Sequence, residues 1–341
     1  MTELPGMDTP ALERFLRESG VNLQGALRVE MISGGRSNLT YKASDDVSSW
    51  VVRRPPTSGL TPSAHDMARE WAVTRALGPT AVPVAGAVAF DADGTVLGAP
   101  MTVVDFQPGR VIRTSDDLSD LTDAQIAANA SELVHVLATL HAVDYLEVGL
   151  GDFGRPDGFV ARQVSTWARQ WKQVKTRDLP DVERLHAALA ASVPSGTASS
   201  IVHGDFRVDN TILKSEDVGT VAAVVDWEMS TRGDPLTDVA LMCVYRQPIF
   251  DAVLGVSAAW TSQRYPSADE LAQLYSSTSG RDLDHWSFYL ALANFKLGVI
   301  GEGITYRALS GSDTGAGAAE AAHATAEFAA AGLRALSGAT A

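Results

Sequence analysis

Two short apolar runs with a turn between them constrain the fold of this chain more than any other feature. Residues 211–213 and 221–225 are β-branched or apolar, and the segment between them is mostly polar. This pattern predicts a β-hairpin. Asn210 immediately precedes the first run, and Asp226 immediately follows the second. A hairpin would therefore place an amide oxygen and a carboxylate side by side, at the same end of two neighbouring strands.

This pairing of polar groups suits a magnesium ion. Mg²⁺ binds few protein ligands and takes the others from phosphate oxygens and water, so Asn210 and Asp226 are candidate metal ligands. Asp205 lies a short loop before Asn210. A carboxylate in that position could accept a proton from a substrate hydroxyl. Metal ligands beside a carboxylate base match the arrangement of kinase-type phosphoryl transfer.

The residues around the hairpin resemble the catalytic and metal-binding motifs of protein-kinase-like enzymes. His203-Gly204-Asp205 stands where protein kinases have His-Arg-Asp, and Asp226-Trp227-Glu228 stands where they have Asp-Phe-Gly. The strings HGDFRVDN and VVDWEMSTRGDPLTDVA are most similar to the aminoglycoside phosphotransferase and choline kinase branch. Within it, they resemble the kinase-like domains fused to some acyl-CoA dehydrogenases. Each motif is short, but their order and spacing are specific, and the resemblance covers nearly the whole chain.

The resemblance implies an α+β, bilobal protein-kinase-like fold. We expect residues 1–107 to form a small nucleotide-binding lobe with an antiparallel sheet. Residues 108–341 would form a larger, mostly helical lobe for catalysis and substrate binding. Strand-like runs prevail up to residue 104, and long helical patterns follow. One of these helices is predicted to begin with a capping box of Thr122 and Gln125, and another with Asp234 as its N-cap. The implied cofactors are ATP and Mg²⁺, and the implied acceptor is a hydroxylated small molecule.

A glycine-rich turn between the first two predicted strands is a candidate phosphate-binding loop. Glycines let backbone N–H groups approach phosphate oxygens, and polar side chains can add donors. The turn departs from the protein-kinase pattern G-x-G-x-x-G, although GGxSN resembles the version found in small-molecule kinases. An ordinary hairpin turn is the alternative. The candidate residues are Gly34, Gly35, Ser37 and Asn38.

The third predicted strand, residues 50–53, resembles the kinase strand that ends in a phosphate-binding lysine. Arg53 takes the place of that lysine and keeps its positive charge, with Arg54 as the alternative. A helix predicted over residues 62–77 contains Glu70. By resemblance, Glu70 pairs with the cation of the third strand and holds it against the phosphates. Solvated arginines and a surface glutamate are the ordinary alternative.

Several other residues take their roles from the resemblance. Asp105 and Phe106 fall at the hinge between the lobes, where adenine would bond to backbone groups. Arg207 falls where many kinases place a lysine on the γ-phosphate. Asp238 corresponds to the aspartate that hydrogen-bonds the backbone of the catalytic loop. Glu228 is an open candidate for a contact with metal or substrate.

A basic segment bears on the acceptor. Protein kinases lack the helix predicted over residues 159–175, and in related phosphotransferases inserted helices border the acceptor site. Its basic character disfavours a polycationic aminoglycoside and suits a neutral or anionic acceptor, for example a hydroxyacyl-CoA. An apolar part of that acceptor could meet Trp167 or Trp171, unless both belong to the core. The basic residues are Arg155, Arg162, Arg169, Lys172, Lys175 and Arg177.

Composition narrows the class of protein further. A net charge of -14 and a pI near 4.9 argue against nucleic-acid binding. No uncharged apolar run approaches the ~20 residues of a membrane-spanning helix. The first residues lack the basic and apolar regions of a signal peptide, so we expect a cytoplasmic protein with no membrane partner. Cys243, the single cysteine, lies in an apolar stretch and is predicted to be a core residue.

Two classes of function remain. The first is a phosphotransferase acting on an alcohol group, with acceptors ranging from an aminoglycoside antibiotic to a choline- or homoserine-type metabolite. The second is a nucleotide-binding pseudokinase module, which only the arginine at position 53 supports. Intact Asp205, Asn210 and Asp226 favour the enzyme. Protein kinase activity is not expected, because Asp234 follows Asp226 too closely to leave room for an activation segment.

Overall fold

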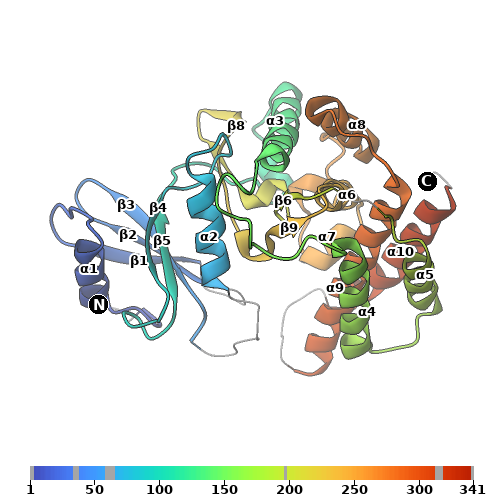
Figure 1. Ribbon diagram of the computed structural model, residues 1–341, viewed down its shortest axis with the longest axis horizontal. Helices are drawn as coiled ribbons and strands as arrows, with labels where there is room; N and C mark the ends of the chain where they lie inside the picture. The colour runs from blue at the N-terminus through green and yellow to red at the C-terminus, as the bar shows by residue number, and fades with distance from the viewer. Residues whose placement is uncertain (1–3, 34–37, 58–65, 196–197, 312–317, 339–341) are drawn as a thin grey trace.

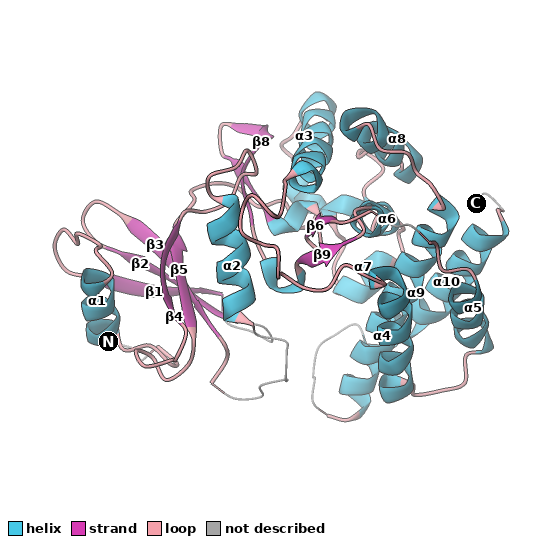
Figure 2. Cartoon of the chain, viewed as in Figure 1, coloured by secondary structure: helices cyan, strands magenta, loops and turns pink. Residues whose placement is uncertain are grey.

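The computed structural model describes residues 4–33, 38–57, 66–195, 198–311 and 318–338. A smaller part built on a sheet contains the N-terminus, and a larger, mostly helical part contains the C-terminus (Figures 1 and 2). A five-stranded antiparallel sheet followed by many helices confirms the predicted α+β class. The division of the chain at residue 107 stays a prediction.

The sheet of the smaller part has the spatial order β1-β2-β3-β5-β4. Successive side chains of a strand point to opposite faces, and β2 and β3 bury every second residue. One face packs against Leu12 and Leu16 of helix α1 (Thr9–Glu18), and α2 (Met67–Leu77) lies on the other side (Figure 1). The strands are β1 (Arg28–Ser33), β2 (Leu39–Ser44), β3 (Ser49–Arg54), β4 (Ala87–Asp91) and β5 (Met101–Asp105).

The larger part packs its helices around one apolar core. Helix α3 (Asp123–Ala142) begins with the predicted capping box of Thr122 and Gln125. Helix α9 (Trp286–Leu309) is buried on most sides and packs against α10. None of the helices in the described ranges is long and apolar enough to cross a membrane. The others are α4 (Phe159–Val174), α5 (Pro180–Ala191), α6 (Leu236–Val244), α7 (Phe250–Leu254), α8 (Ala268–Ser279) and α10 (Ala318–Ser337).

The predicted hairpin is present. Strand β7 (Thr211–Lys214) pairs antiparallel with β8 (Asp217–Val224), and Thr211 lies opposite Val224. Strand β8 begins earlier than predicted, because the polar residues after Asp217 are also extended. A second small pair joins β6 (Ser200–Val202) to β9 (Thr231–Gly233), one before and one after the hairpin. Strands β6 and β9 thus hold the two ends of residues 203–230, the segment that carries the candidate catalytic residues.

Two helix starts differ from the prediction. Helix α2 begins at Met67 rather than at residue 62, because Asp66 is its N-cap and accepts the N–H of Arg69 at 2.9 Å. Helix α6 begins after Pro235 rather than with Asp234 as its N-cap. Asp234 still accepts the N–H of Leu236 at 2.9 Å.

Buried polar side chains connect separate elements of the larger part. Asn129 on α3 is fully buried, donates to the carbonyl oxygen of Val218 at 2.9 Å and accepts the hydroxyl of Tyr265 at 2.8 Å. Glu302 on α9 is also fully buried and accepts the N–H of Thr176 at 3.0 Å. Buried polar groups are costly without such partners, so these contacts help to fix how the helices pack.

We predict that Asn129→Ala lowers the free energy of unfolding by about 2–4 kcal/mol, because it leaves a buried carbonyl and a buried hydroxyl without a partner. Urea unfolding followed by circular dichroism measures this change. Ser131→Ala is the matched control, since Ser131 lies on the exposed side of the same helix, and should change stability by less than about 0.5 kcal/mol. Equal stability of the two variants would contradict the assigned role of Asn129.

Candidate active site

A buried carboxylate anchors the loop that leads from β6 to the hairpin. Asp238 on α6 is 1% exposed and accepts the backbone N–H groups of His203 at 2.6 Å and Gly204 at 2.8 Å. His141 on α3 lies 3.3 Å from the same carboxylate. Burial by itself would raise the pKa of Asp238, but these hydrogen bonds and the nearby histidines lower it below its usual value. Asp238 is therefore an anion that holds the loop in one conformation.

Asp205 follows this anchor and is held through both carboxylate oxygens. The hydroxyl of Tyr245 donates to Oδ1. The side-chain nitrogen of Asn210 donates to Oδ2 at 3.1 Å and to the backbone oxygen of Asp205 at 2.8 Å. The amide oxygen of Asn210 therefore points away from Asp205. The side chain of Asp205 is still 27% exposed, so a substrate could reach it.

The ends of the hairpin bring Asn210 and Asp226 next to each other. The N–H of Val225 donates to the backbone oxygen of Asn210 at 2.9 Å, and Asp226 is the next residue. Asp226 has a φ of 67°, which is uncommon outside glycine and is tolerated best by asparagine and aspartate. Its side chain is 36% exposed. The structure thus places an amide oxygen and an accessible carboxylate where the sequence predicted them.

A cation from the sheet reaches this pair of residues. Arg53 on β3 lies 2.5 Å from Glu70 on α2 and 3.4 Å from Asp226. Burial raises the pKa of Glu70, and the charge of Arg53 opposes that shift. Arg54, the alternative cation, points elsewhere and donates to the backbone oxygens of Gly6 at 2.5 Å and Leu97 at 2.8 Å. Arg53, rather than Arg54, therefore reaches the candidate metal ligand Asp226, and its contact with phosphate stays a prediction.

Glu228 adds a further acid beside Asp226. Burial and the negative charge of Asp226 raise the pKa of Glu228 to about 7, and Arg53 opposes the shift. Glu228, Asp226 and Glu70 thus place three acidic side chains around one arginine. A cation placed among these carboxylates would be stabilised electrostatically.

Arg207 lies against carboxylates of its own loop. Its guanidinium is 3.6 Å from Asp205 and 3.2 Å from Asp209, and the side chain is 15% exposed. The guanidinium also lies over the rings of Tyr245 and Phe250, at 5.5 Å and 5.6 Å from their centroids. These contacts make Arg207 a close neighbour of Asp205. Its contact with the γ-phosphate stays a prediction.

Of the other cofactor-binding candidates, Gly34, Gly35 and Ser37 lie outside the described residues, and Asn38 is buried at the start of β2. At the hinge, the N–H of Asp105 donates to Gly86 at 2.8 Å, and that of Phe106 donates to Ser49 at 3.0 Å. Both N–H groups are therefore already bonded within the protein. An adenine at the hinge would have to use other backbone groups.

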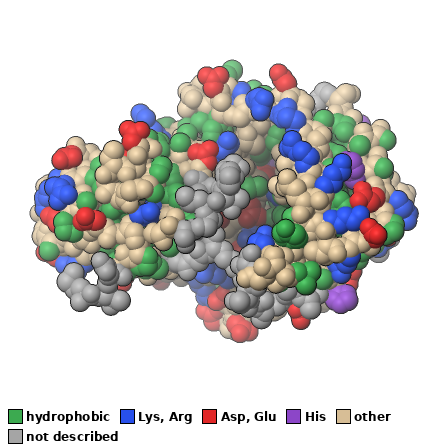
Figure 3. Space-filling view, turned by 90° about the horizontal axis from the view of Figure 1, so that it is seen from below, with side chains coloured by type: hydrophobic (Ala, Val, Ile, Leu, Met, Phe, Trp, Pro, Cys, Tyr) green, Lys and Arg blue, Asp and Glu red, His purple; other side chains and the backbone are tan. Residues whose placement is uncertain are grey.

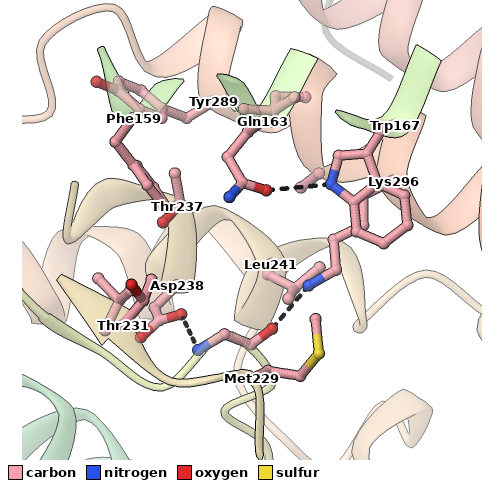
Figure 4. Close-up of a pocket in the computed structure, with 14 residues that line it drawn as sticks. Phe159, Gln163, Trp167, Met229, Thr231, Thr237, Asp238, Leu241, Tyr289 and Lys296 are labelled. Atoms are coloured by element: carbon pink, nitrogen blue, oxygen red, sulfur yellow. Dashed lines mark hydrogen bonds between the residues drawn. The ribbon is translucent and has the colours of Figure 1, made fainter. Parts of the chain in front are cut away.

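A pocket lies beside the catalytic loop, between α4, α6 and α9 (Figure 4). Lys296 reaches from α9 to the backbone oxygen of Gly204, to which it donates at 2.7 Å, and lies 5.5 Å from the ring centroid of Trp167. Burial lowers the pKa of Lys296, while the charge of Asp205 opposes that shift. Lys296 was not among the predicted site residues. A lone lysine within an apolar helix was the signal that could have indicated a site.

The basic residues around α4 do not line this pocket. From α4, the described residues that line it are uncharged: Phe159, Gln163 and Trp167. Trp171 faces the core instead and donates to Glu183 at 2.8 Å. Basic side chains are visible over the surface of the larger part in Figure 3. Among the predicted ones, Arg162 bonds backbone oxygens of its own segment, Lys175 pairs with Asp178, Arg177 pairs with Glu302, and Arg169 and Lys172 are exposed.

Comparison with known sequences agrees with this geometry. A model of the phosphotransferase enzyme family matches residues 28–271, which include the sheet, the catalytic loop and α6. The chain is also 32% identical over 311 residues to acyl-CoA dehydrogenase family member 10 of Mus musculus. That match covers 90% of this chain and 29% of the mouse protein, so the chain spans only a minor part of its relative.

Solved structures show the same architecture. A protein of Ralstonia eutropha, provisionally assigned as an aminoglycoside phosphotransferase, superposes with a TM-score of 0.83 at 32% identity, over 98% of this chain and 99% of that one. Aminoglycoside phosphotransferase APH(4)-Ia, in complex with AMP-PNP and hygromycin B, gives a TM-score of 0.60 at 17% identity, over 95% and 98%. The second likeness concerns the fold alone. The predicted bilobal, kinase-like fold is confirmed, and the chain belongs to the phosphotransferase enzyme family.

Proposed function

We propose that this protein is an ATP- and magnesium-dependent phosphotransferase that transfers the γ-phosphoryl group to a hydroxyl of a small molecule. One observation carries the proposal. A single loop and hairpin bring Asp205, Asn210 and Asp226 together, with the amide of Asn210 bonded to Asp205 at 3.1 Å. The proposed proton acceptor thus contacts one candidate magnesium ligand, Asn210. The other, Asp226, follows directly after Val225, whose N–H bonds the backbone oxygen of Asn210.

The residues present fit the implied cofactors. The amide oxygen of Asn210 and the carboxylate of Asp226 would hold Mg²⁺, which needs few protein ligands when phosphate oxygens complete its shell. Bound Mg²⁺ would neutralise charge on the β- and γ-phosphates. Arg53, held by Glu70, would add a second positive charge beside them. The complex of a similarly folded phosphotransferase with AMP-PNP supports ATP as the donor.

Phosphoryl transfer depends mainly on positioning and on charge neutralisation. In our proposal, Asp205 orients the acceptor hydroxyl. It takes the proton as the new oxygen–phosphorus bond forms and the bond to ADP breaks. Asp238 contributes indirectly, since it fixes the loop from which Asp205 projects.

We further propose a neutral or anionic acceptor with an apolar part, such as a hydroxyacyl-CoA. The support comes from the pocket beside Gly204, where Lys296 provides a positive charge and Trp167 an apolar wall. Similarity to an acyl-CoA dehydrogenase family member is in keeping with such an acceptor. An aminoglycoside is the second candidate, because the similar Ralstonia protein is provisionally assigned that activity. A polycation would be repelled by Lys296 at close range.

Replacement of the proposed base tests the reaction. Asp205→Asn should keep the fold and the affinity for Mg·ADP, but reduce turnover by roughly 10² or more, as expected when a general base is lost. ATP consumption across a panel of hydroxyacyl-CoA esters, other hydroxylated metabolites and aminoglycosides measures the turnover. Asp217→Asn, at the exposed turn of the same hairpin, is the control and should stay fully active. Wild-type turnover by Asp205→Asn would remove Asp205 from the mechanism.

Replacement of Lys296 tests the acceptor. Lys296→Met keeps most of the side-chain length and removes the charge. It should lower kcat/KM for anionic acceptors roughly tenfold, which corresponds to about 1.4 kcal/mol. Lys172→Met removes a charge from the exposed side of α4 and should change little. Efficient phosphorylation of kanamycin-like compounds by the wild type, improved further in Lys296→Met, would instead establish the antibiotic activity.

A further inference from the structure

Tyr245 contacts the proposed base from a distant element. It caps the C-terminal end of α6, and its hydroxyl donates to Oδ1 of Asp205, which precedes it by 40 residues. The opposite oxygen, Oδ2, receives the amide of Asn210 at 3.1 Å. Donors on both sides leave the carboxylate little freedom to rotate about its last bond. Tyr245 thus helps to fix the rotation of the Asp205 carboxylate.

The ring of Tyr245 is itself firmly placed. It is 2% exposed, and its centroid lies 4.5 Å from that of Phe250. The guanidinium of Arg207 lies over both rings and 3.6 Å from Asp205. Aromatic contacts and a cation over the ring each add stability to this arrangement. The hydroxyl is therefore presented to Asp205 from a rigid support.

Tyr245 also has the right protonation state for this contact. Burial and the nearby charge of Asp205 raise its pKa well above 10, and Arg207 only partly opposes the shift. The phenol therefore keeps its proton at neutral pH. Since a carboxylate can only accept, the hydrogen bond runs from Tyr245 to Asp205.

We propose that Tyr245 is a positioning residue of phosphoryl transfer, whose hydroxyl holds the Asp205 carboxylate in line with the acceptor hydroxyl. The inference rests on the proposed function, because Tyr245 acts only through Asp205. Small displacements of a reacting group can reduce a rate by as much as about 10². Loss of the hydroxyl should therefore reduce kcat while leaving the binding of nucleotide intact.

The matched control is another buried tyrosine of the same lobe. Tyr265 is 3% exposed, lies 4.7 Å from the ring centroid of Trp260 and donates to Asn129 at 2.8 Å. It resembles Tyr245 in burial, aromatic packing and hydrogen bonding, but its partner has no part in the site. Tyr265→Phe therefore reports what the loss of a buried hydroxyl does to folding alone.

The experiment compares Tyr245→Phe with Tyr265→Phe in kcat, in acceptor KM, in melting temperature and in Mg·ADP affinity measured by calorimetry. The acceptor is the substrate found by the panel; if the panel yields none, the slow transfer of phosphate from ATP to water is followed. Tyr245→Phe should lower kcat roughly 10- to 100-fold. Its Mg·ADP affinity and acceptor KM should stay within about twofold of wild type. Tyr265→Phe should lose about as much stability as Tyr245→Phe but keep the wild-type kcat. Equal kcat in the two variants would overturn the proposal.

A double variant separates this inference from the proposed function. Tyr245→Phe added to Asp205→Asn should cause no further loss of kcat, because both changes act on one contact. Additive losses would contradict a role through Asp205. If the wild type transfers phosphate neither to an acceptor nor to water, the proposed function fails. If Asp205→Asn is fully active, the role of Asp205 as the base fails, and this inference fails with it. If Asp205→Asn is inactive but Tyr245→Phe is active, only this inference fails. Phe250→Leu loosens the ring support without removing the hydroxyl. Should Tyr245→Phe not fold, Phe250→Leu decides the question. A partial loss of kcat would support the proposal, and an unchanged kcat would overturn it.

Discussion

The carboxylate of Asp238 is the contact on which the candidate site depends. It is a buried charge, and a buried charge persists only with good partners. Its partners are the backbone N–H groups of His203 and Gly204 and the ring of His141. Gly204 has a φ of 84°, and a Cβ there would lie 2.8 Å from the backbone oxygen of Met229. Asp238 and Gly204 together therefore determine the path of the chain into Asp205.

The charges of the site come from parts of the chain that are far apart. Arg53 belongs to the sheet and Asp226 to the hairpin, 173 residues away, yet their side chains are 3.4 Å apart. Glu70 on α2 holds Arg53 from the other side at 2.5 Å. A positive charge from the smaller part thus meets the proposed metal ligands of the larger part. In our account, a nucleotide between the two parts would contact both.

Local features of the sequence predicted much of this arrangement. The hairpin and the capping box at Thr122 depend on neighbouring residues, so short patterns were enough. Contacts between distant elements left no local pattern. The approach of Tyr245 to Asp205, and of Lys296 to Gly204 across 92 residues, depends on how helices dock. Packing likewise decides which side of α4 faces the pocket, and the basic residues of α4 do not line it.

The central claim is that the hairpin end holds a magnesium–nucleotide complex. Calorimetric titration of AMP-PNP, with Mg²⁺ and with EDTA, into the wild type and Asp226→Asn tests it most directly. Asparagine keeps the side-chain shape and tolerates the positive φ of this position. We predict that Mg²⁺ tightens binding to the wild type by roughly tenfold or more and that Asp226→Asn loses most of this effect. The same dependence on Mg²⁺ in both proteins would contradict the account.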